Sequence, residues 1–538
     1  MGSEIAKVTS NSRIKCGGIV SGCHESYQGQ FARLSYVGNL HSIEGLLIFT
    51  LLVTGATRGS LVTAARNPPT PSATEQCSIY ASPSGKDKNF GSSPKSPKTF
   101  AGAAASTGPG SVVCLMGGTY VLTSTFKPPT SGTPSSWIVY RNYDDAPVKF
   151  VWAGAADASP MFDMNGGKFP SSPAYLEFRG LNLDGGGKAG DGFFCRGSHH
   201  LRFIANSISN TGGSGIGTIQ CDYLMVDHNT VTHNGYIPAA AASNASHYSW
   251  TSGISLNSNQ WYDSYRGFHN VISNNIVTDE VDQSAKHSDG NGIILDLTDR
   301  TYNYSAANTP PALIVNNVVY GNGGRCIEAY VVTNFWILNN TCYKNVLDLP
   351  PNVDASISVS NSHDGYVVNN LVVAASSSEP CYGEERTTEN IRYRANLCFG
   401  KSTASRFPDS AQWILADPLF LSPPDVQLAD RIQNSEALSR SLLGDGLSLR
   451  PRSPALAKGI DPSTLPGLPK HIIADLKKYI YTDFAGKQRP PGGPFDLGAF
   501  QSSPLRSDFP ELGRLERLAM HVPGSDRETP RQLVLSSQ

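Results

Sequence analysis

The 538-residue sequence has few charged residues, almost no net charge and no apolar run of membrane-spanning length. Asp, Glu, Lys and Arg make up 16% of the chain, and its formal net charge is −1. A chain this close to neutral has no electrostatic basis for capturing nucleic acid or anionic lipid, so we expect neither as a partner. The ten cysteines form no CxxC pair and no Cys/His zinc spacing. This pattern favours disulfides over a metal role.

The N-terminal region carries a signal for secretion in an unusual place. Residues 1–40 have no pattern, and residues 41–65 contain the apolar run LLIFTLLV (46–53) followed by small residues. That run matches the core of a signal peptide and is too short to cross a bilayer. Its position suggests an over-long gene model that truly starts near His41; the alternative is a buried strand. We therefore expect a secreted protein with no membrane contact after signal removal.

Other local features agree with secretion. Three possible glycosylation triplets begin at Asn244, Asn303 and Asn339. Residues 66–76 (RNPPTPSATEQ) have the composition of a linker. Cysteines separated by about one repeat length, or close in sequence, predict disulfides between neighbouring coils. The pairs are Cys195 with Cys221, Cys326 with Cys342, and Cys381 with Cys398.

One short phrase, an Asn between apolar residues, recurs from Tyr175 to Phe399. It occurs at Asn182, Asn206, Asn229, Asn275, Asn317, Asn340, Asn370 and Asn396. The successive spacings are 24, 23, 46, 42, 23, 30 and 26 residues, and a period in this range marks a solenoid. Alternating β-branched residues and Gly/Asn/Asp turns indicate strands. We therefore predict an all-β, right-handed parallel β-helix whose corner asparagines form a hydrogen-bonded ladder.

The β-helix is expected over residues 77–400, with a short cap helix at Phe100 to Ser106 covering its first open end. Two insertions, residues 236–268 and 298–311, are expected to emerge on one face and to build a binding site. Residues 401–501 are expected to form the last coils and a closing segment. Residues 502–538 are polar and are predicted to be disordered.

Aligning the coils by their asparagines places two columns of polar residues at the next corner. The first column contains His233, Asp279 and Lys344, and the second contains Asn234, Glu280 and Asn322. Adjacent parallel strands lie about 4.8 Å apart, so we expect His233 and Asp279 to be neighbours. Such a ridge could supply an acid, a base and a neutralising charge, or it could be an ordinary solvated corner.

The run from Asp279 to Asp296 (DEVDQSAKHSDGNGIILD) is the densest group of ionisable side chains. Asp279, Glu280, Asp282 and Asp289 could hold a hard cation such as calcium through oxygen ligands. Lys286 or His287 could abstract a proton next to a uronate carboxylate, with a cation or Arg325 stabilising the charge that develops. The alternative is a polar loop followed by a turn, because DGNG is a common turn sequence.

Two stretches carry a resemblance to a known superfamily. Residues 78–145, including YASPSGKD and GPGSVVCLMGGTY, resemble the first segment of secreted pectate-lyase-like β-helix proteins. DGNG before an apolar strand is similar to a stretch in family-nine pectate lyases, which are calcium-dependent. That resemblance places Asp191 at a calcium-binding position, but the paired Asp is absent near Gly213. It also places Ile294 at the catalytic lysine, so Lys286, His287 or His233 would have to replace that base.

Aromatic residues in the first insertion suggest contacts with sugar rings. Trp250, Trp261 and Tyr262 could stack on a polysaccharide, or they could pack the insertion against the coils. Glu328 and Asp296 could be the carboxylate pair of a glycoside hydrolase, although they follow an equivalent Ile by one and three residues.

The sequence thus predicts a secreted, monomeric lyase or epimerase that acts on an acidic polysaccharide. A glycoside hydrolase is the first alternative. A non-catalytic carbohydrate-binding or cell-surface protein is the second, because function is set by a site and not by a fold.

Overall fold

The fold is taken from a computed structural model, which describes residues 76–237, 248, 250–284, 286–297, 309–348, 355–385, 387–401, 413–426 and 446–502. All of these belong to one unit, residues 65–538. The predictions for residues 1–40, for the signal-like segment, for nearly all of the linker and for the tail after residue 502 fall outside the described residues. Within the described part of the chain, no helix is long and apolar enough to cross a membrane.

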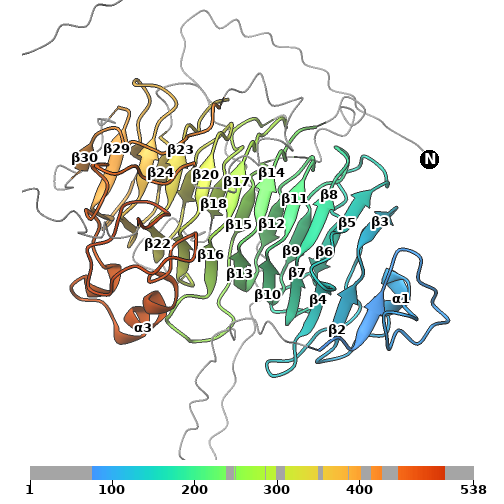
Figure 1. The fold of residues 1–538 in the computed structure, drawn as a ribbon. Helices are drawn as coiled ribbons and strands as arrows, with labels where there is room; N and C mark the ends of the chain where they lie inside the picture. The colour runs from blue at the N-terminus through green and yellow to red at the C-terminus, as the bar shows by residue number, and fades with distance from the viewer. Residues whose placement is uncertain are drawn as a thin grey trace, which may run out of the picture. The chain divides into compact units, whose positions relative to one another are not determined.

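Three parallel sheets form a parallel β-helix, which confirms the predicted fold (Figure 1). Each full coil gives one strand to sheet A, then one to sheet B and one to sheet C. Each strand pairs with its counterpart in the next coil, as β13 does with β16 and β15 with β18.

Strand bounds follow the sheets. Sheet A contains β1 (Ile79–Ala81), β2 (Val112–Leu115), β4 (Ile138–Asn142), β7 (Leu176–Arg179), β10 (His199–Ile204), β13 (Asp222–Asp227), β16 (Asn270–Ser273), β19 (Ala312–Val315), β22 (Phe335–Leu338), β25 (Tyr366–Val368) and β28 (Arg392–Arg394). Sheet B contains β3 (Gly118–Leu122), β5 (Val148–Trp152), β8 (Leu181–Asp184), β11 (Ser207–Ser209), β14 (Thr230–Thr232), β17 (Ile276–Thr278), β20 (Val318–Tyr320), β23 (Thr341–Tyr343), β26 (Leu371–Val373), β29 (Asn396–Phe399) and β30 (Trp413–Leu415). Sheet C contains β6 (Phe162–Asn165), β9 (Phe193–Arg196), β12 (Ile216–Ile219), β15 (Ile254–Asn257), β18 (Ile293–Asp296), β21 (Ile327–Tyr330), β24 (Ile357–Ser360) and β27 (Tyr382–Glu385).

The core lies inside the coils, because side chains alternate between the two faces of each strand. Equivalent inward positions stack from coil to coil, as Ile216, Ile254 and Ile293 do in sheet C. The predicted cap helix is α1 (Phe100–Ala104), and its N-cap residue Thr99 accepts a hydrogen bond from the backbone of Gly102. Phe100 packs its ring against aromatic rings of the first coils and closes that end of the core.

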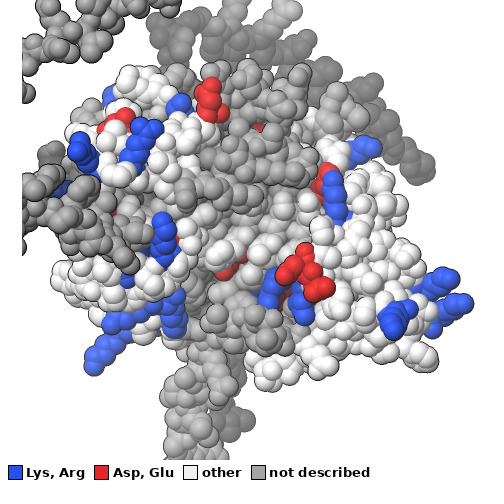
Figure 2. All heavy atoms as spheres, in the orientation of Figure 1, with Lys and Arg blue, Asp and Glu red and all other residues white. Residues whose placement is uncertain are grey.

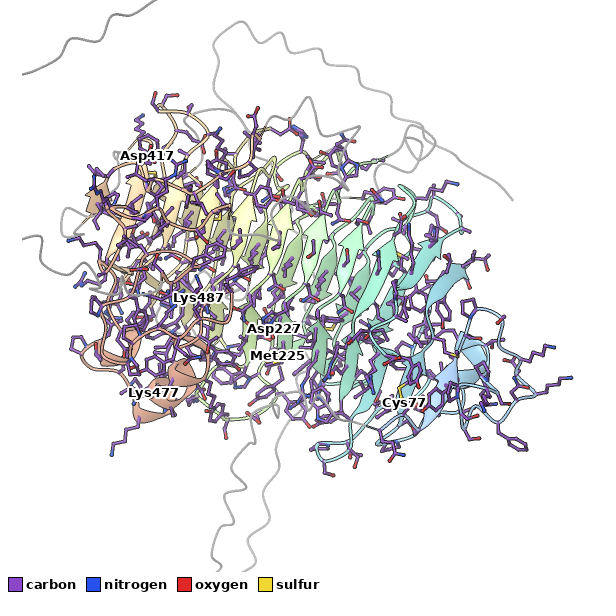
Figure 3. The ribbon with its side chains drawn as sticks, viewed as in Figure 1. Cys77, Met225, Asp227, Asp417, Lys477 and Lys487 are labelled. Carbon is purple, nitrogen blue, oxygen red and sulfur yellow. A yellow bond between two sulfur atoms is a disulfide. The ribbon has the colours of Figure 1, made fainter. Side chains whose placement is uncertain are left out.

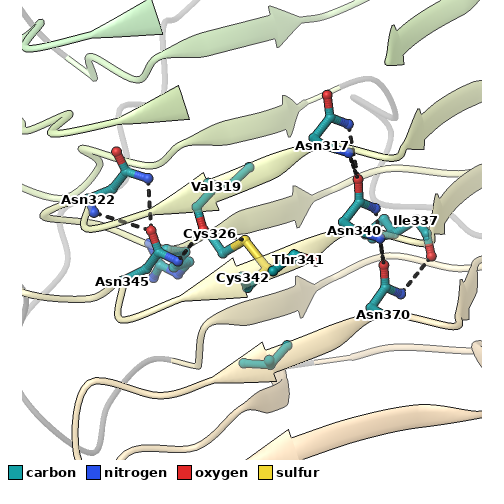
Figure 4. Close-up of a disulfide and its surroundings, with 12 residues drawn as sticks. Asn317, Val319, Asn322, Cys326, Ile337, Asn340, Thr341, Cys342, Asn345 and Asn370 are labelled. Atoms are coloured by element: carbon teal, nitrogen blue, oxygen red, sulfur yellow. Dashed lines mark hydrogen bonds between the residues drawn. A yellow bond between two sulfur atoms is a disulfide. The ribbon is translucent and has the colours of Figure 1, made fainter. Parts of the chain in front are cut away.

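The predicted asparagine ladder stands at the corner between sheets A and B. Its buried members are Asn206, Asn229, Asn275, Asn317, Asn340, Asn370 and Asn396. Each side-chain amide donates to the side-chain oxygen of the next member, over 2.9–3.2 Å (Figure 4). The placement of Asn182 in the ladder was wrong. Asn182 pairs with Ser207, so it lies one residue out of register, and its side chain is exposed.

A second buried ladder stands at the corner between sheets B and C. It runs through Thr211, Asn234, Glu280, Asn322 and Asn345. The alternative that this column is an ordinary solvated corner was wrong, because all of its members are buried. A Cβ added to Gly253 would lie 3.0 Å from the Glu280 side chain. The backbone of the neighbouring coil therefore passes too close to Glu280 for any residue larger than glycine at this position.

All three predicted disulfides are present, and Cys77–Cys114 is a fourth that was not predicted. Cys77 and Cys114 are separated by 37 residues, far more than one coil, and their bond ties β1 to the neighbouring strand β2 (Figure 3). Cys326–Cys342 lies inside the coil between the two ladders (Figure 4). Four disulfides fit a protein that folds in an oxidising compartment.

The interpretation of residues 236–268 as one insertion was wrong. This segment contains β15, so it is a loop, a sheet C strand and a second loop. The wide spacings therefore come from longer loops within a coil and not from extra coils. One triplet proposed for glycosylation also fails, because Asn339 is fully buried and leaves no room for a glycan. Asn244 and Asn303 lie outside the described residues.

The C-terminal part folds back over sheets A and B. It contains the 3₁₀ helix η3 (Pro462–Thr464) and a helix that was not predicted, α3 (Lys470–Tyr479) (Figures 1 and 3). Ile472 and Leu476 of α3 pack on apolar outer side chains of sheet A, including Trp336. Charged side chains of both signs are mixed over the face drawn in Figure 2, as expected for a near-neutral chain.

Candidate active site

The outer face of sheet C carries the polar side chains that converge. In each strand of this sheet the first and third residues point into the core, so the second and fourth point outward. Ile294 pairs with Glu328 and Asp296 pairs with Tyr330 across β18 and β21. Glu328 and Asp296 are one and three residues after paired isoleucines, as the sequence indicated. Both offsets are odd, so both carboxylates share the outer face of adjacent coils.

Neighbouring amides and one guanidinium hold these two carboxylates. Glu328 lies 3.3 Å from Nη1 of Arg325, and Asn291 donates to the same carboxylate oxygen over 3.1 Å. The backbone N–H of Arg325 donates to the side chain of Asn291 over 2.9 Å, which fixes that amide's orientation. On the next strand, Asn257 donates to Asp296 over 2.6 Å.

The loop between β17 and β18 folds around the carboxylate of Asp282. Asp282 is buried and accepts backbone N–H groups from Ser284 and Ser288 at 3.1 Å and from Asp289 at 3.3 Å. Thr251 ties the loop to the previous coil, because its backbone oxygen accepts from Gly290 over 2.7 Å. The loop is thereby fixed against the start of sheet C, and Asp289 is held beside Glu328 and Asp296.

Asp289 has the most strongly perturbed environment in this group. Burial raises the pKa of its carboxyl well above the usual range, and the negative charges of Glu328, Asp296 and Asp282 raise it further. The nearby guanidinium of Arg325 opposes these effects. The surroundings of Asp289 thus favour the protonated form of its carboxyl, an arrangement that suits general acid catalysis.

His287 and Lys286 lie on the same loop. Nδ1 of His287 lies 2.6 Å from the backbone oxygen of Asp282, so Nδ1 carries the proton and donates. This leaves Nε2 as the basic nitrogen, 3.5 Å from Asp348, and half of the side chain is exposed. The ammonium of Lys286 lies 5.3 Å from the centre of the Trp250 ring.

The predicted pairing of His233 with Asp279 is confirmed. Nδ1 of His233 lies 2.8 Å from Asp279, and the hydroxyl of Tyr236 donates to the other carboxylate oxygen over 2.7 Å. The rings of His233 and Tyr236 stack with centres 4.0 Å apart. Lys344 is not part of this group, since it lies two coils beyond Asp279 and its ammonium is 5.2 Å from the Tyr343 ring centre.

Glu280 turns inward from this pair and joins the second ladder. Asn234 donates to one of its carboxyl oxygens over 3.0 Å, and its own backbone N–H donates to Asn322 over 3.0 Å. Its other carboxyl oxygen is buried without a hydrogen-bond partner. Burial raises the pKa of Glu280 well above the usual range, and the neighbouring charge of Asp279 adds to this effect. Glu280 is thus the one ionisable residue among the described members of this ladder, in surroundings that oppose its ionisation.

Asp191 lies apart from the Asp279 to Asp289 run. The backbone N–H of Ser214 donates to it over 2.6 Å, and burial raises its pKa to about 7. The resemblance expects a second Asp near Gly213 and Ser214. A Cβ on Gly213 would approach within 2.4 Å of the Asp191 carboxyl oxygen, so no side chain fits at Gly213, and Ser214 is no carboxylate.

The five carboxylates considered for calcium do not meet at one point. Asp279 and Asp282 are engaged by other groups, Glu280 lies in the ladder, Asp289 faces sheet C, and Asp191 is on an earlier coil. Among the described residues, no three His, Cys, Asp or Glu side chains are grouped so that they could hold a metal ion. These side chains do not fit a shared calcium site, and the requirement for calcium stays a prediction.

The three aromatic residues predicted to bind sugar lie at opposite ends of β15. Trp250 precedes this strand and is 55% exposed beside Lys286. Trp261 and Tyr262 follow the strand and pack toward sheet A. Arg266 lies 4.7 Å from the Trp261 ring centre, and the Tyr262 ring centre is 4.2 Å from that of His199. The packing alternative therefore describes Trp261 and Tyr262 well, and Trp250 is the ring beside the loop of Asp289.

Sequence reasoning missed the amides that position the carboxylates. Asn291 was treated as part of a turn, although its place immediately before an outward-facing strand was a usable signal. Asn257 gave no signal, because the segment around it was interpreted as an insertion.

Comparison with known proteins yields structural likenesses only. No known family model matches the chain, and no curated protein matches its sequence. Among solved structures, it is similar to the pectate lyase Pel9A, with a TM-score of 0.43 and 18% identity over 80% of this chain and 97% of that one. A structure described as a glycoside hydrolase gives a TM-score of 0.43 and 10% identity, covering 63% and 94%. The A-module of the mannuronan C-5 epimerase AlgE4 from Azotobacter vinelandii gives 0.30 and 14%, covering 57% and 91%. These likenesses extend to the fold and no further, and the parallel β-helix itself rests on the strand pairings above.

Proposed function

We propose that this chain is a secreted enzyme that cleaves a polysaccharide on the outer face of sheet C. The observation that carries the proposal is the placement of Asp289, a carboxyl of raised pKa, beside Asp296 and Glu328 on adjacent coils. A raised-pKa acid beside an ionised carboxylate is the pair that glycosidic bond hydrolysis needs. Asn257 and Asn291 donate hydrogen bonds to Asp296 and Glu328 and orient these two carboxyl groups, so the group is preorganised.

The roles follow from the environment of each side chain. Asp289 gives its proton to the glycosidic oxygen as the bond from that oxygen to the sugar carbon breaks. Asp296 is partly exposed and accepts a proton from the water that adds to the carbon. Glu328 lies 3.3 Å from the Arg325 guanidinium, and its negative charge raises the pKa of Asp289. The products are two shorter chains, one with a new reducing end.

A lyase reaction on a uronate polysaccharide is the second candidate, and His287 supports it. The backbone oxygen of Asp282 fixes the His287 tautomer so that Nε2 is an accessible base. That nitrogen could remove the proton next to a uronate carboxylate, with Lys286 nearby to offset negative charge. The product would be an unsaturated sugar and not a hydrolysed one.

One experiment separates these reactions. The full chain, produced through an oxidising secretory route, is incubated with polygalacturonate, pectin, alginate, xylan and β-glucan, with calcium or with a chelator. New reducing ends without ultraviolet absorbance, lost in Asp289→Asn and retained in His287→Gln, identify hydrolysis. Absorbance lost in His287→Gln identifies a lyase, and its sensitivity to chelator tests the calcium prediction. If neither signal appears and the sugar stereochemistry is unchanged, a non-catalytic polysaccharide-binding role becomes the better account.

A further inference from the structure

Trp250 differs from the other large aromatic residues near the candidate site. It is 55% exposed, whereas Tyr248 two residues earlier is buried and donates its hydroxyl to the backbone of Lys188 over 2.8 Å. The backbone of Trp250 has a φ of 54°, which is an unfavourable left-handed conformation for a bulky residue. Other aromatic residues of the coils, such as Tyr175 and Tyr223, share this conformation but are buried, so what sets Trp250 apart is the exposure of its ring.

The position of Trp250 is fixed relative to Asp289. Its neighbour Thr251 is buried, donates its hydroxyl to the backbone of Val281 over 2.7 Å, and accepts from Gly290 over 2.7 Å. Those two contacts fall on either side of the loop that carries Asp289. The ring of Trp250 therefore belongs to the same rigid frame as the proposed acid, at the edge of sheet C.

Lys286 completes the arrangement. Its ammonium lies 5.3 Å from the centre of the Trp250 ring, within the range of a cation–π contact. More than half of Trp250 stays open to solvent beside this cation. An aromatic face with a cation at one side offers an apolar platform and a polar contact to a ring that carries hydroxyl or acid groups.

We propose that Trp250 and Lys286 form a sugar-binding subsite next to Asp289, in which one pyranose ring of the polysaccharide stacks on the indole. This inference rests on the proposed function for its location, but binding can be measured without cleavage. The subsite positions a sugar next to the one whose linkage is cleaved. It acts on substrate affinity and leaves the proton transfers to the carboxylates.

The test measures binding in the uncleaving Asp289→Asn background of the full chain. Calorimetric titrations use three probes: hexasaccharides of galacturonate, of mannuronate and of β-1,4-linked glucose. For at least one probe, Trp250→Ala should weaken binding about tenfold, and Trp250→Phe should recover part of the loss. Phe90→Ala, which removes an aromatic ring that is 90% exposed elsewhere, serves as the matched control and should leave affinity unchanged.

Two results would overturn the subsite. One is that none of the probes binds the Asp289→Asn protein. The other is that Trp250→Ala binds as tightly as its parent while the melting temperature is unchanged. Binding that depends on Trp250, in a chain that cleaves no polysaccharide, would contradict the proposed function and support the subsite. The two proposals can therefore fail separately.

Discussion

Two polar regions of the molecule are partly or fully buried: the ladder between sheets A and B, and the group on the outer face of sheet C. They differ in how their polar groups are paired. Along the ladder each asparagine donates to the next one and accepts from the previous one, so donors and acceptors match. On sheet C, Asp289 is placed among three carboxylates that oppose its ionisation. The second ladder is intermediate, with Glu280 in a place where an asparagine would match its neighbours.

This difference helps to distinguish polar residues that stabilise a repeated fold from polar residues that take part in a reaction. A buried polar group that finds every partner stabilises the coil and needs no further explanation. Conflicting charges cost stability, so their presence in one small region points to a use. In the described part of the chain the two regions share no hydrogen-bond partners, so a variant in the group on sheet C should leave the ladder intact.

Asp289→Asn should produce the largest effect, on activity alone. Without the acidic proton, the rate of cleavage should fall by about 10²–10⁴-fold, the usual contribution of a general acid. The amide is similar in size and removes a charge conflict, so the melting temperature should not fall. Steady-state assays for reducing ends and thermal unfolding measure the two quantities. A lower melting temperature with full activity per folded molecule would show that Asp289 stabilises the fold and takes no part in catalysis.

Asn317→Ala should produce the opposite result. It removes five hydrogen bonds: three that the Asn317 amide donates, to Ile272, Val315 and Asn340, and two that it accepts from Asn275. The free energy of unfolding should fall by roughly 2–4 kcal/mol because the partners stay buried. Asn182→Ala is the matched control: the residue is exposed and out of register, so its loss should change stability by less than about 0.5 kcal/mol. Equal effects for the two variants in urea unfolding would contradict the ladder's role.

Glu280→Asn should repair the second ladder. The pKa of Glu280 is raised in the folded protein, so its contribution to stability is present below the unfolded value of 4.5 and is lost as the pH rises. The variant should therefore be more stable than the wild type at pH 8, by roughly 1–3 kcal/mol, and the gain should shrink near pH 4. Urea unfolding at both pH values measures this. A difference that does not change with pH would show that Glu280 does not titrate in this range.

Glu328→Gln should give the smallest effect, a shift in the pH dependence of the residual activity. Removing this negative charge lowers the pKa of Asp289, so the proton is lost at lower pH. The alkaline limb of the rate profile should move down by roughly one pH unit. Asp348→Asn, which changes a carboxylate beside His287 that does not appear among the causes acting on Asp289, is the control. An unmoved limb in Glu328→Gln would exclude Asp289 as the group that titrates there.

The repeat of asparagines was sufficient to predict the solenoid and its first ladder, because stacking in register is a property of sequence spacing. The disulfides were predicted from the cysteines themselves, one from a separation of about one coil and two from closeness in sequence. The pairing of His233 with Asp279 followed from the same alignment. The register error at Asn182 arose because an asparagine one residue away from the corner gives the same local phrase. The strand β15 was missed because long loops precede and follow it, and a coil can carry longer loops without losing any of its strands.

The sequence by itself determined that this chain coils, which residues meet at each corner, and where ionisable side chains are dense. Only the tertiary structure decided which of them share a face. In the folded chain the Glu280 side chain points into the second ladder, Asp282 accepts hydrogen bonds from backbone N–H groups, and Asp289 lies beside Glu328 and Asp296. The physical reason is that spacing fixes position along a coil, whereas the direction of a loop side chain depends on hydrogen bonds to neighbouring coils. Those bonds exist only once the coils have stacked.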